Sequence, residues 1–135
     1  MKRILVFSLA MAALNLGGCA AVALTALGVG MATGVSHTLG GMVYKTFAAP
    51  QAQVKHATVG ALNRMQIKVT GAKRDGSIET IRAKAADRDI EIELEALTPG
   101  TTRMAVIAKK DSGVLRDGAT ATEIILQTEK LVGPT

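Results

Sequence analysis

The chain has 135 residues, of which 16 are basic and 11 acidic, and it contains one cysteine, one tyrosine, two phenylalanines and no tryptophan. Its basic residues are scattered among acidic ones and aromatic side chains are scarce, which argues against a nucleic-acid interface and against a sugar-stacking site. A single cysteine excludes a disulfide within the chain, and the charged part after residue 44 is long enough for only one modest core.

Residues 1–18 are predicted to form a secretory signal peptide. Lys2 and Arg3 make a positive start, residues 4–16 make an apolar run, and two glycines follow. The apolar run is shorter than the roughly 20 residues that a transmembrane helix needs. We therefore expect residues 1–18 to be cleaved rather than to span a membrane.

The last three residues of this segment and the residue that follows it form the sequence Leu-Gly-Gly-Cys, which ends at Cys19. The motif closely resembles the lipobox of bacterial lipoproteins. The resemblance implies cleavage after Gly18, diacylation of the Cys19 thiol and acylation of the new amino terminus. Ala20 follows, where lipoprotein sorting would place Asp for retention in the inner membrane. The resemblance therefore implies a lipid-anchored protein of the outer membrane that faces the periplasm.

Residues 19–43 form an uncharged lead that is rich in Ala, Gly, Val and Thr. Gly30 and Gly34 have the small-xxx-small spacing that lets membrane helices approach closely. Three interpretations stay open: a flexible tether, a membrane-inserted helix, and a glycine-zipper-like element for oligomerisation. Glycine inside a helix costs about 1 kcal/mol relative to alanine, which favours the tether. His37 lies here without an acidic neighbour in sequence, so we read it as incidental.

Residues 44–135 are predicted to form one α+β domain. Residues 42–47 favour a short extended strand before Pro50, and apolar residues at helical spacing predict a helix over 51–65. Gly60 weakens this helix, and its alanine-rich packing indicates that it lies close against a sheet. The predicted apolar positions are Val54, Ala57, Ala61, Leu62 and Met65.

Four β-type runs follow, over residues 67–73, 78–85, 90–97 and 102–109. Turns at Asp75-Gly76-Ser77, Asp87-Arg88 and Pro99-Gly100-Thr101 connect them into an antiparallel meander with one apolar and one charged face. The predicted core positions are Ile81, Ala83, Ile92, Leu94 and Val106. The predicted cross-strand pairs are Val69–Ala83, Lys73–Glu79, Ala83–Ile92, Ile81–Leu94, Arg82–Glu93, Lys84–Glu91, Leu94–Val106 and Glu91–Lys109.

A final helix begins after Asp117, a favourable N-cap, and ends at Gly133-Pro134. The predicted architecture is a two-layer α+β sandwich, with a helix, a four-stranded antiparallel meander and a second helix. The apolar stripe predicted for this last helix consists of Ala121, Ile124, Ile125, Thr128, Leu131 and Val132.

The whole layout resembles a known family. The lipobox, the Gly-rich lead, the sequence Tyr-Lys-Thr-Phe at 44–47 and the strand with Thr102-Arg103 are similar to the small bacterial lipoproteins grouped as domain of unknown function 3568. The resemblance covers most of the chain after Cys19. It implies no assigned activity.

The residue inventory points away from catalysis. A nucleophile needs a base and an orienting partner, but His56 is the only histidine of the predicted domain, and Ser77 and Ser112 fall in turns. His56 flanks the apolar stripe of its helix, as a partly exposed helix residue does. It has no His or Cys partner for a metal. We therefore predict a protein that is not an enzyme and has no cofactor or metal.

The charged face of the predicted sheet favours binding. Glu91, Glu93 and Glu95 alternate along one strand, and we read them as a solvated face that pairs with Arg82 and Lys84 rather than as a cation site. Lys68 and Lys73 complete this face of mixed charge.

The sequence thus predicts a lipid-anchored envelope protein with a small non-catalytic binding or scaffolding domain. Its expected partners are the membrane, through the anchor, and another envelope protein or a second copy. The alternative is a glycine-zipper-like oligomerising protein.

Overall fold

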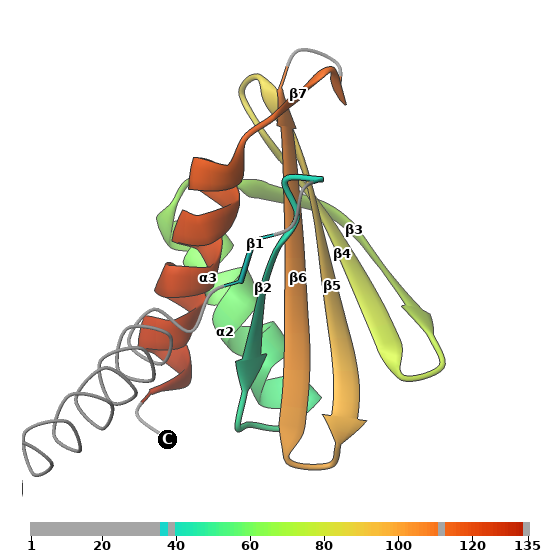
Figure 1. The fold of residues 1–135 in the computed structure, drawn as a ribbon. Coiled ribbons are helices and arrows are strands. Elements are labelled where there is room, and N and C mark those ends of the chain that lie inside the picture. The colour runs from blue at the N-terminus through green and yellow to red at the C-terminus, as the bar shows by residue number, and fades with distance from the viewer. Residues whose placement is uncertain (1–35, 38–39, 111–112, 134–135) are drawn as a thin grey trace, which may run out of the picture. The chain divides into compact units, whose positions relative to one another are not determined.

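The computed structural model describes residues 36–37, 40–110 and 113–133. Two helices pack side by side on one face of an antiparallel sheet (Figure 1). The predictions for residues 1–18, for Cys19, and for Gly30 and Gly34 concern residues outside this described part. None of the described helices is long and apolar enough to cross a membrane.

The elements follow one another in an order close to the predicted one. In chain order they are β1 (Ser36–His37), β2 (Val43–Phe47), α2 (Gln51–Arg64), β3 (Lys68–Asp75), β4 (Ile78–Ala85), β5 (Arg88–Thr98), β6 (Thr101–Lys110), β7 (Leu115–Arg116) and α3 (Gly118–Val132).

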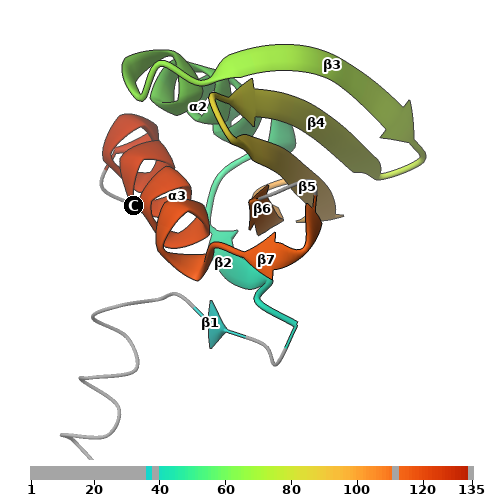
Figure 2. The same ribbon diagram turned by 90° about the horizontal axis from the view of Figure 1, so that it is seen from above.

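The sheet has the strand order β1-β2-β6-β5-β4-β3, and β7 adds a short pair to β6. All pairs are antiparallel, and β3 to β6 form the predicted meander. After β2 the chain crosses through α2 to the far edge of the sheet, where β3 begins (Figure 2). The two-layer α+β architecture is therefore confirmed. Its extension by β2 beside β6 was not predicted, and neither was β1, which uses two residues of the 19–43 lead.

The core lies between the helices and the sheet face that they cover, which we call the covered face. Val43, Val106, Ile92 and Ile81 are register partners in one row across β2, β6, β5 and β4, and each is at most 1% exposed. Burying such a side chain contributes about 1.5–3 kcal/mol, so this row ties four strands into one core.

Helix α2 confirms the helix predicted over 51–65. The carbonyl of Pro50 accepts hydrogen bonds from the N–H groups of Gln53 and Val54 at 3.0 and 3.1 Å. A Cβ built on Gly60 would lie 3.1 Å from Cδ1 of Leu131, so the absence of a side chain at Gly60 permits close approach of α3. The buried residues of α2 are Val54, Ala57, Thr58, Ala61 and Leu62.

Helix α3 begins and ends where the sequence predicts. The carboxylate of Asp117 accepts the Thr120 N–H at 3.0 Å, as an N-cap does, and Gly133 ends the helix with φ +88°. The predicted stripe is also confirmed, although Leu131 and Val132 are half-buried near the helix end. Its fully buried members are Ala121, Ile124, Ile125 and Thr128.

The strand faces are as predicted, but two registers differ by two residues. Arg82 lies opposite Glu91 and not Glu93, because the β4–β5 turn consists of residues 86–87. Leu94 likewise lies opposite Met104 and not Val106, because the β5–β6 turn is shorter than predicted. A shift of two residues returns each side chain to its own face, so the apolar face survives the error. The observed pairs that replace the predicted ones are Ile81–Ile92, Ala83–Ile90, Lys84–Asp89 and Glu91–Ile107.

One of the two pairs predicted between β3 and β4 is confirmed, and the other is wrong. Val69 lies opposite Ala83 as predicted, but Lys73 lies opposite Thr80 rather than Glu79. A β-bulge between Val69 and Gly71 inserts an extra residue into β3, and this changes the face on which the rest of the strand points. Lys73 therefore lies on the sheet face away from the helices, and Glu79 lies on the covered face.

Candidate functional site

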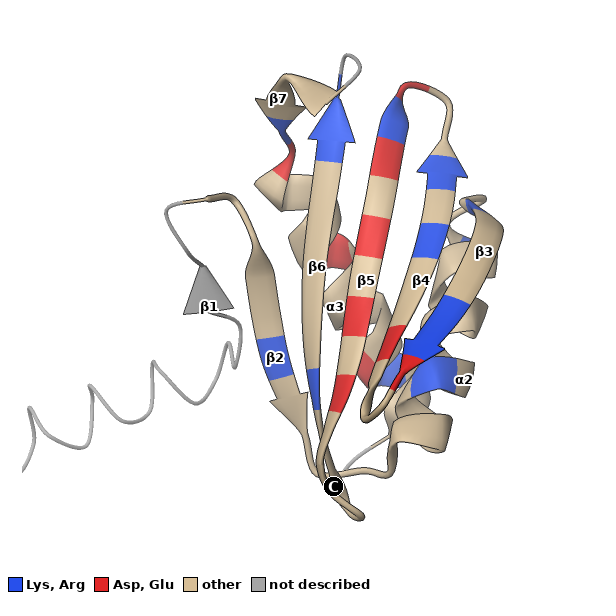
Figure 3. Cartoon of the chain, turned by 90° about the vertical axis from the view of Figure 1, so that its right-hand side faces the viewer, with Lys and Arg blue, Asp and Glu red and all other residues tan. Residues whose placement is uncertain are grey.

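The sheet face away from the helices, which we call the open face, carries most of the charged side chains of the sheet. Strand β5 places Asp89, Glu91, Glu93 and Glu95 at alternate positions, which all point to this face. Figure 3 shows these acidic positions as bands along β5, with basic positions on the flanking strands. The mixed charge predicted for this face is confirmed.

Three of the four acidic residues of β5 have a basic partner on a neighbouring strand. Arg82 Nε lies 3.6 Å from Glu91 Oε2, Lys84 Nζ lies 3.8 Å from Asp89 Oδ1, and Arg103 donates to Glu95. Five of these six side chains are at least 48% exposed, Glu95 being the exception, so each pair contributes only about 0–1 kcal/mol. These ion pairs therefore contribute little to the stability of the fold.

Glu93 is different, because it has no ion-pair partner within the described residues. Its neighbours across the strands are Thr80 on β4 and Ala105 on β6. Neither carries a charge, and the Glu93 side chain is exposed. One carboxylate at the middle of the open face is therefore available to a partner.

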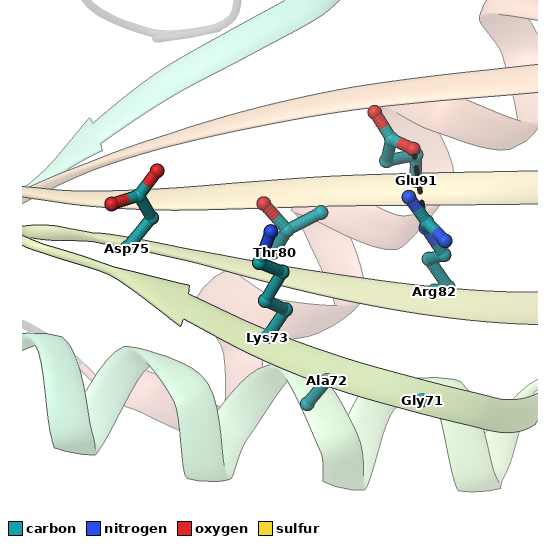
Figure 4. Close-up of a pocket in the computed structure, with 7 residues that line it drawn as sticks. All are labelled: Gly71, Ala72, Lys73, Asp75, Thr80, Arg82 and Glu91. Carbon is teal, nitrogen blue, oxygen red and sulfur yellow. Dashed lines mark ion pairs between the residues drawn. The ribbon is translucent and has the colours of Figure 1, made fainter.

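Three shallow hollows lie along the open face. The first, of about 340 Å³, lies between β3 and β5, and Figure 4 shows Lys73 next to Thr80 and the Arg82–Glu91 pair at its side. The second, of about 250 Å³, shares Arg82 and Glu91 with the first. Gly71 lines the first hollow, and the absence of a side chain there lets another chain approach the sheet closely.

The third hollow, of about 350 Å³, contains Glu93. Apolar or small side chains of three strands line it beside the carboxylate: Tyr44 of β2, Ile78 of β4 and Ala105 of β6. Tyr44 reaches this site because β2 pairs with β6, which places Tyr44 directly opposite Ala105. Glu95 and Arg103, which form an ion pair with each other, also line the hollow. The hollow therefore combines an apolar wall with a net charge of one carboxylate, a combination that suits a basic side chain with a long aliphatic stem.

The other residues that the sequence singled out do not come together. His56 is exposed on α2, in the helix layer, whereas Ser77 is exposed in the β3–β4 turn. Ser36 and His37 form β1, and Ser112 lies outside the described residues. Over the ranges 36–37, 40–110 and 113–133, no three His, Cys, Asp or Glu side chains are grouped so that they could hold a metal ion.

Sequence reasoning missed a buried carboxylate on the covered face. Glu79 is 4% exposed, accepts a hydrogen bond from Lys55 of α2, and lies 3.1 Å from Arg74 Nη2 of β3. The hydrogen bond from Lys55, assisted by Arg74, lowers the pKa of Glu79 in spite of its burial. Because Glu79 alternates in phase with Ile81, its position was readable from the sequence. Its contacts fix the β3–β4 hairpin to α2.

A second carboxylate that accepts several hydrogen bonds lies where α3 begins. The Thr120 N–H and hydroxyl donate to Asp117, and Arg88 of β5 donates as well. These contacts lower the pKa of Asp117 to about 2. The sequence predicted the N-cap but not the contact with Arg88, because only the folded sheet brings β5 beside the start of α3.

The comparisons with known proteins point to one family. The family model described as "Protein of unknown function (DUF3568)" matches residues 2–109 of the chain. That match spans the lead, α2 and almost all of the sheet. No curated protein matches the chain.

Proposed function

We propose that this chain, which belongs to the DUF3568 family of proteins of unknown function, is a lipid-anchored protein of the bacterial outer membrane. In this proposal residues 1–18 are removed and Cys19 carries the acyl chains. The domain faces the periplasm and has a non-catalytic role: it binds or scaffolds another envelope component through the open face of its sheet.

The anchor is supported by the segment that ends at Cys19. Its positive start, its short apolar run and the Leu-Gly-Gly-Cys motif agree in residue type, spacing and position. Each buried methylene of an acyl chain contributes about 0.8 kcal/mol, so two or more chains make a stable anchor.

The observation that carries the binding role is the hollow around Glu93. An exposed carboxylate without an ion-pair partner in the described part of the chain stands beside Tyr44 and Ile78. A Lys or Arg side chain of a partner would pair with Glu93 and cover the apolar wall with its stem. Partial desolvation strengthens such a charge pair relative to the exposed pairs on the same face. We therefore infer a protein partner that presents a basic side chain.

The test uses the full-length acylated chain in membranes, with a photo-cross-linking aromatic residue at Tyr44. We expect a partner protein to be cross-linked, and Glu93→Lys to reduce its yield at least tenfold because like charges then meet. The matched control is Glu123→Lys, which reverses an exposed charge on α3. Equal yields from the two variants would refute the role of the open face.

The same membranes separate this proposal from the oligomerising alternative. If the cross-linked product is a second copy of the chain and disappears in Gly30→Leu with Gly34→Leu, the glycine-zipper interpretation is correct instead. The anchor has its own control. Intact-mass analysis of Cys19→Ser should show an unprocessed precursor without acyl chains, and recovery of a mature acylated form would refute the anchor.

A further inference from the structure

The end of the domain where β6 leads into β7 carries two adjacent aliphatic side chains in water. Val114 is 80% exposed and Leu115 is 54% exposed, more than any other large apolar residue in the described part of the chain. Figure 1 shows β7 at the end of the sheet, beyond the first turn of α3. A single exposed aliphatic residue needs no explanation, but an adjacent pair at the tip of a domain is a candidate contact surface.

The same end carries the net positive charge of the domain; we call it the basic end. Figure 3 shows basic positions near the upper ends of β4, β5 and β6. The acidic residues that the structure describes there are Asp87, Asp89 and Asp117. The rest of the described domain has seven residues of each sign. The seven basic residues of this end are Arg64, Lys68, Lys84, Arg88, Lys109, Lys110 and Arg116.

The pairing of β7 with β6 sets two of these cations against each other. Lys109 and Arg116 are direct register partners, and on its other side Lys109 lies opposite Asp89 of β5. Among the residues that the structure describes, Asp89 pairs with Lys84, and neither Lys109 nor Arg116 forms an ion pair. Like charges that face each other across two strands are unfavourable by themselves. An anionic surface that lies against both removes this repulsion. Val114, which precedes β7, and Leu115, the first residue of β7, lie between them in the chain.

The segment that leads into β2 lies at this end, whereas Ser36, the first described residue, pairs with Tyr44 nearer the middle of the sheet. A Cβ built on Gly41, whose φ is +72°, would lie 2.8 Å from Cβ of Arg116, so Gly41 lies directly against β7. Between Cys19 and Ser36 lie 16 residues. At about 3.3–3.6 Å per residue they span at most roughly 55 Å, which keeps the basic end within reach of the bilayer.

We propose that the basic end docks on the anionic phospholipid surface of the membrane that holds Cys19. Val114 and Leu115 enter the headgroup region, and Lys109 and Arg116 lie against lipid phosphates. This inference rests on the proposed lipid anchor, because the tether makes a weak surface contact intramolecular. The strands then run away from the membrane, and the open face stays accessible to a partner.

The test uses the absence of tryptophan from the chain. Val114→Trp places a single fluorescent probe at the basic end, and Leu97→Trp is the matched control at a 46% exposed position near the β5–β6 turn, at the opposite end of the sheet. The full-length chain is incorporated into vesicles of phosphatidylcholine, with or without phosphatidylglycerol, that contain brominated lipid as a quencher. We expect at least threefold stronger quenching for Val114→Trp than for Leu97→Trp in the anionic vesicles.

Charge and salt complete the test. In the Val114→Trp chain, Lys109→Gln with Arg116→Gln should reduce quenching at least twofold, whereas Lys73→Gln with Lys130→Gln should leave it unchanged. High salt should also release the contact, since it screens charges but does not extract acyl chains. Equal quenching at both probe positions, or in neutral and anionic vesicles, would overturn the docking.

The outcome also separates docking from anchoring. If the chain floats with all vesicles but the Val114→Trp probe is not quenched, the anchor stands and the docking is wrong. If the chain floats with none of the neutral vesicles, the anchor is wrong. Salt-sensitive binding to phosphatidylglycerol vesicles alone then supports the docking, and its absence overturns it.

Discussion

The two faces of the sheet are made by the same strands, yet they have opposite roles. On the covered face Val43, Val106, Ile92 and Ile81 form a row without water contact. One residue along each strand, the open face has a row that contains the exposed Glu93. Because backbone and register are shared, the difference comes from side-chain alternation alone. One face therefore stabilises the fold and leaves the other free for a partner.

Carboxylates show the same contrast. Glu79 on the covered face is buried between Lys55 and Arg74, and its pKa is lowered. Glu91 on the open face lies 3.6 Å from Arg82, with both side chains about half exposed or more. A charge enclosed by packed elements is part of the fold, whereas a charge on the open face can be changed at little cost.

The largest expected effect separates two adjacent residues of β5. Leu94→Ala should lower the free energy of unfolding by about 2–5 kcal/mol, because it leaves a cavity in the core at a position with 0% exposure. Glu93→Ala should lower it by less than about 1 kcal/mol, since Glu93 is exposed. Urea denaturation of a soluble chain that begins at Ser36 measures both values.

The comparison fails if the two losses are equal, or if the loss for Glu93→Ala is larger. Either result would mean that the apolar and charged faces are exchanged, as a register error of one residue would do to every side chain of a strand. The slope of the free energy with urea should stay unchanged in both variants, which confirms that the same surface is exposed on unfolding.

The next effect compares a carboxylate from each face. Glu79→Ala should cost about 2 kcal/mol, because it removes the partner of Lys55 and opens the contact between the β3–β4 hairpin and α2. Lys55 and Arg74 are 41% and 60% exposed, so they can turn to water and the loss stays below that of a fully buried pair. Glu91→Ala should cost less than about 0.5 kcal/mol. Equal costs would place Glu79 among the surface charges.

Acid should destabilise the fold by protonating Asp117 and Glu79, the two carboxylates whose pKa values are lowered. The pKa of Asp117 is about 2 in the folded chain against an ordinary value of 3.8. A folded pKa below the unfolded one stabilises the protein above pH 4, and the stabilisation disappears as the pH falls towards 2. For Asp117 this loss is about 2 kcal/mol at most, since one pKa unit corresponds to about 1.4 kcal/mol. Glu79 contributes with the same sign.

Asp117→Asn tests this assignment, because Asn keeps the N-cap but has no charge to lose. Urea denaturation at pH 7 and at intervals down to pH 2 should show a smaller loss of stability for Asp117→Asn than for the unchanged chain. Glu93→Gln is the control from the open face and should leave the acid profile as it is. An identical profile for Asp117→Asn would remove Asp117 from the acid response.

The sequence was sufficient to predict which sheet face each side chain points to and where α3 begins and ends. It was not sufficient to predict which residues lie opposite each other on neighbouring strands. Strict alternation predicted that Ile92 and Leu94 are buried, and the Asp117 cap and Gly133 predicted the bounds of α3. The β5–β6 register was misjudged because turns of two and three residues look alike in sequence. The β4–β5 register was misjudged because a two-residue turn can be placed at 86–87 or at 87–88, and exposed charge pairs contribute too little to select between the two positions. The signal for the bulge between Val69 and Gly71 was Gly71 itself, since an isolated glycine inside a strand often marks a bulge, but the predicted register did not use it.

The candidate site was predictable in its chemistry and not in its shape. The charges of β4 and β5 were assigned to the correct face from alternation alone. The hollow around Glu93 was not, because its wall needs Tyr44 beside Ala105, and that contact joins residues 61 positions apart in the chain. Only the crossover through α2 brings β2 to the side of β6.

The smallest expected effect decides the register itself. In the structure Arg82 lies opposite Glu91, whereas the register favoured by the sequence sets it opposite Glu93. A double-mutant cycle with Arg82→Ala and Glu91→Ala should give a coupling of about 0.2–1 kcal/mol, as directly opposite charges do. The cycle with Arg82→Ala and Glu93→Ala should give a coupling near zero, since a diagonal pair on an exposed face is screened by water. Coupling to Glu93 and not to Glu91 would support the predicted turn at Asp87-Arg88 instead of the observed turn at residues 86–87. It would also supply Glu93 with a partner from its own chain and remove the free carboxylate on which the proposed binding face depends.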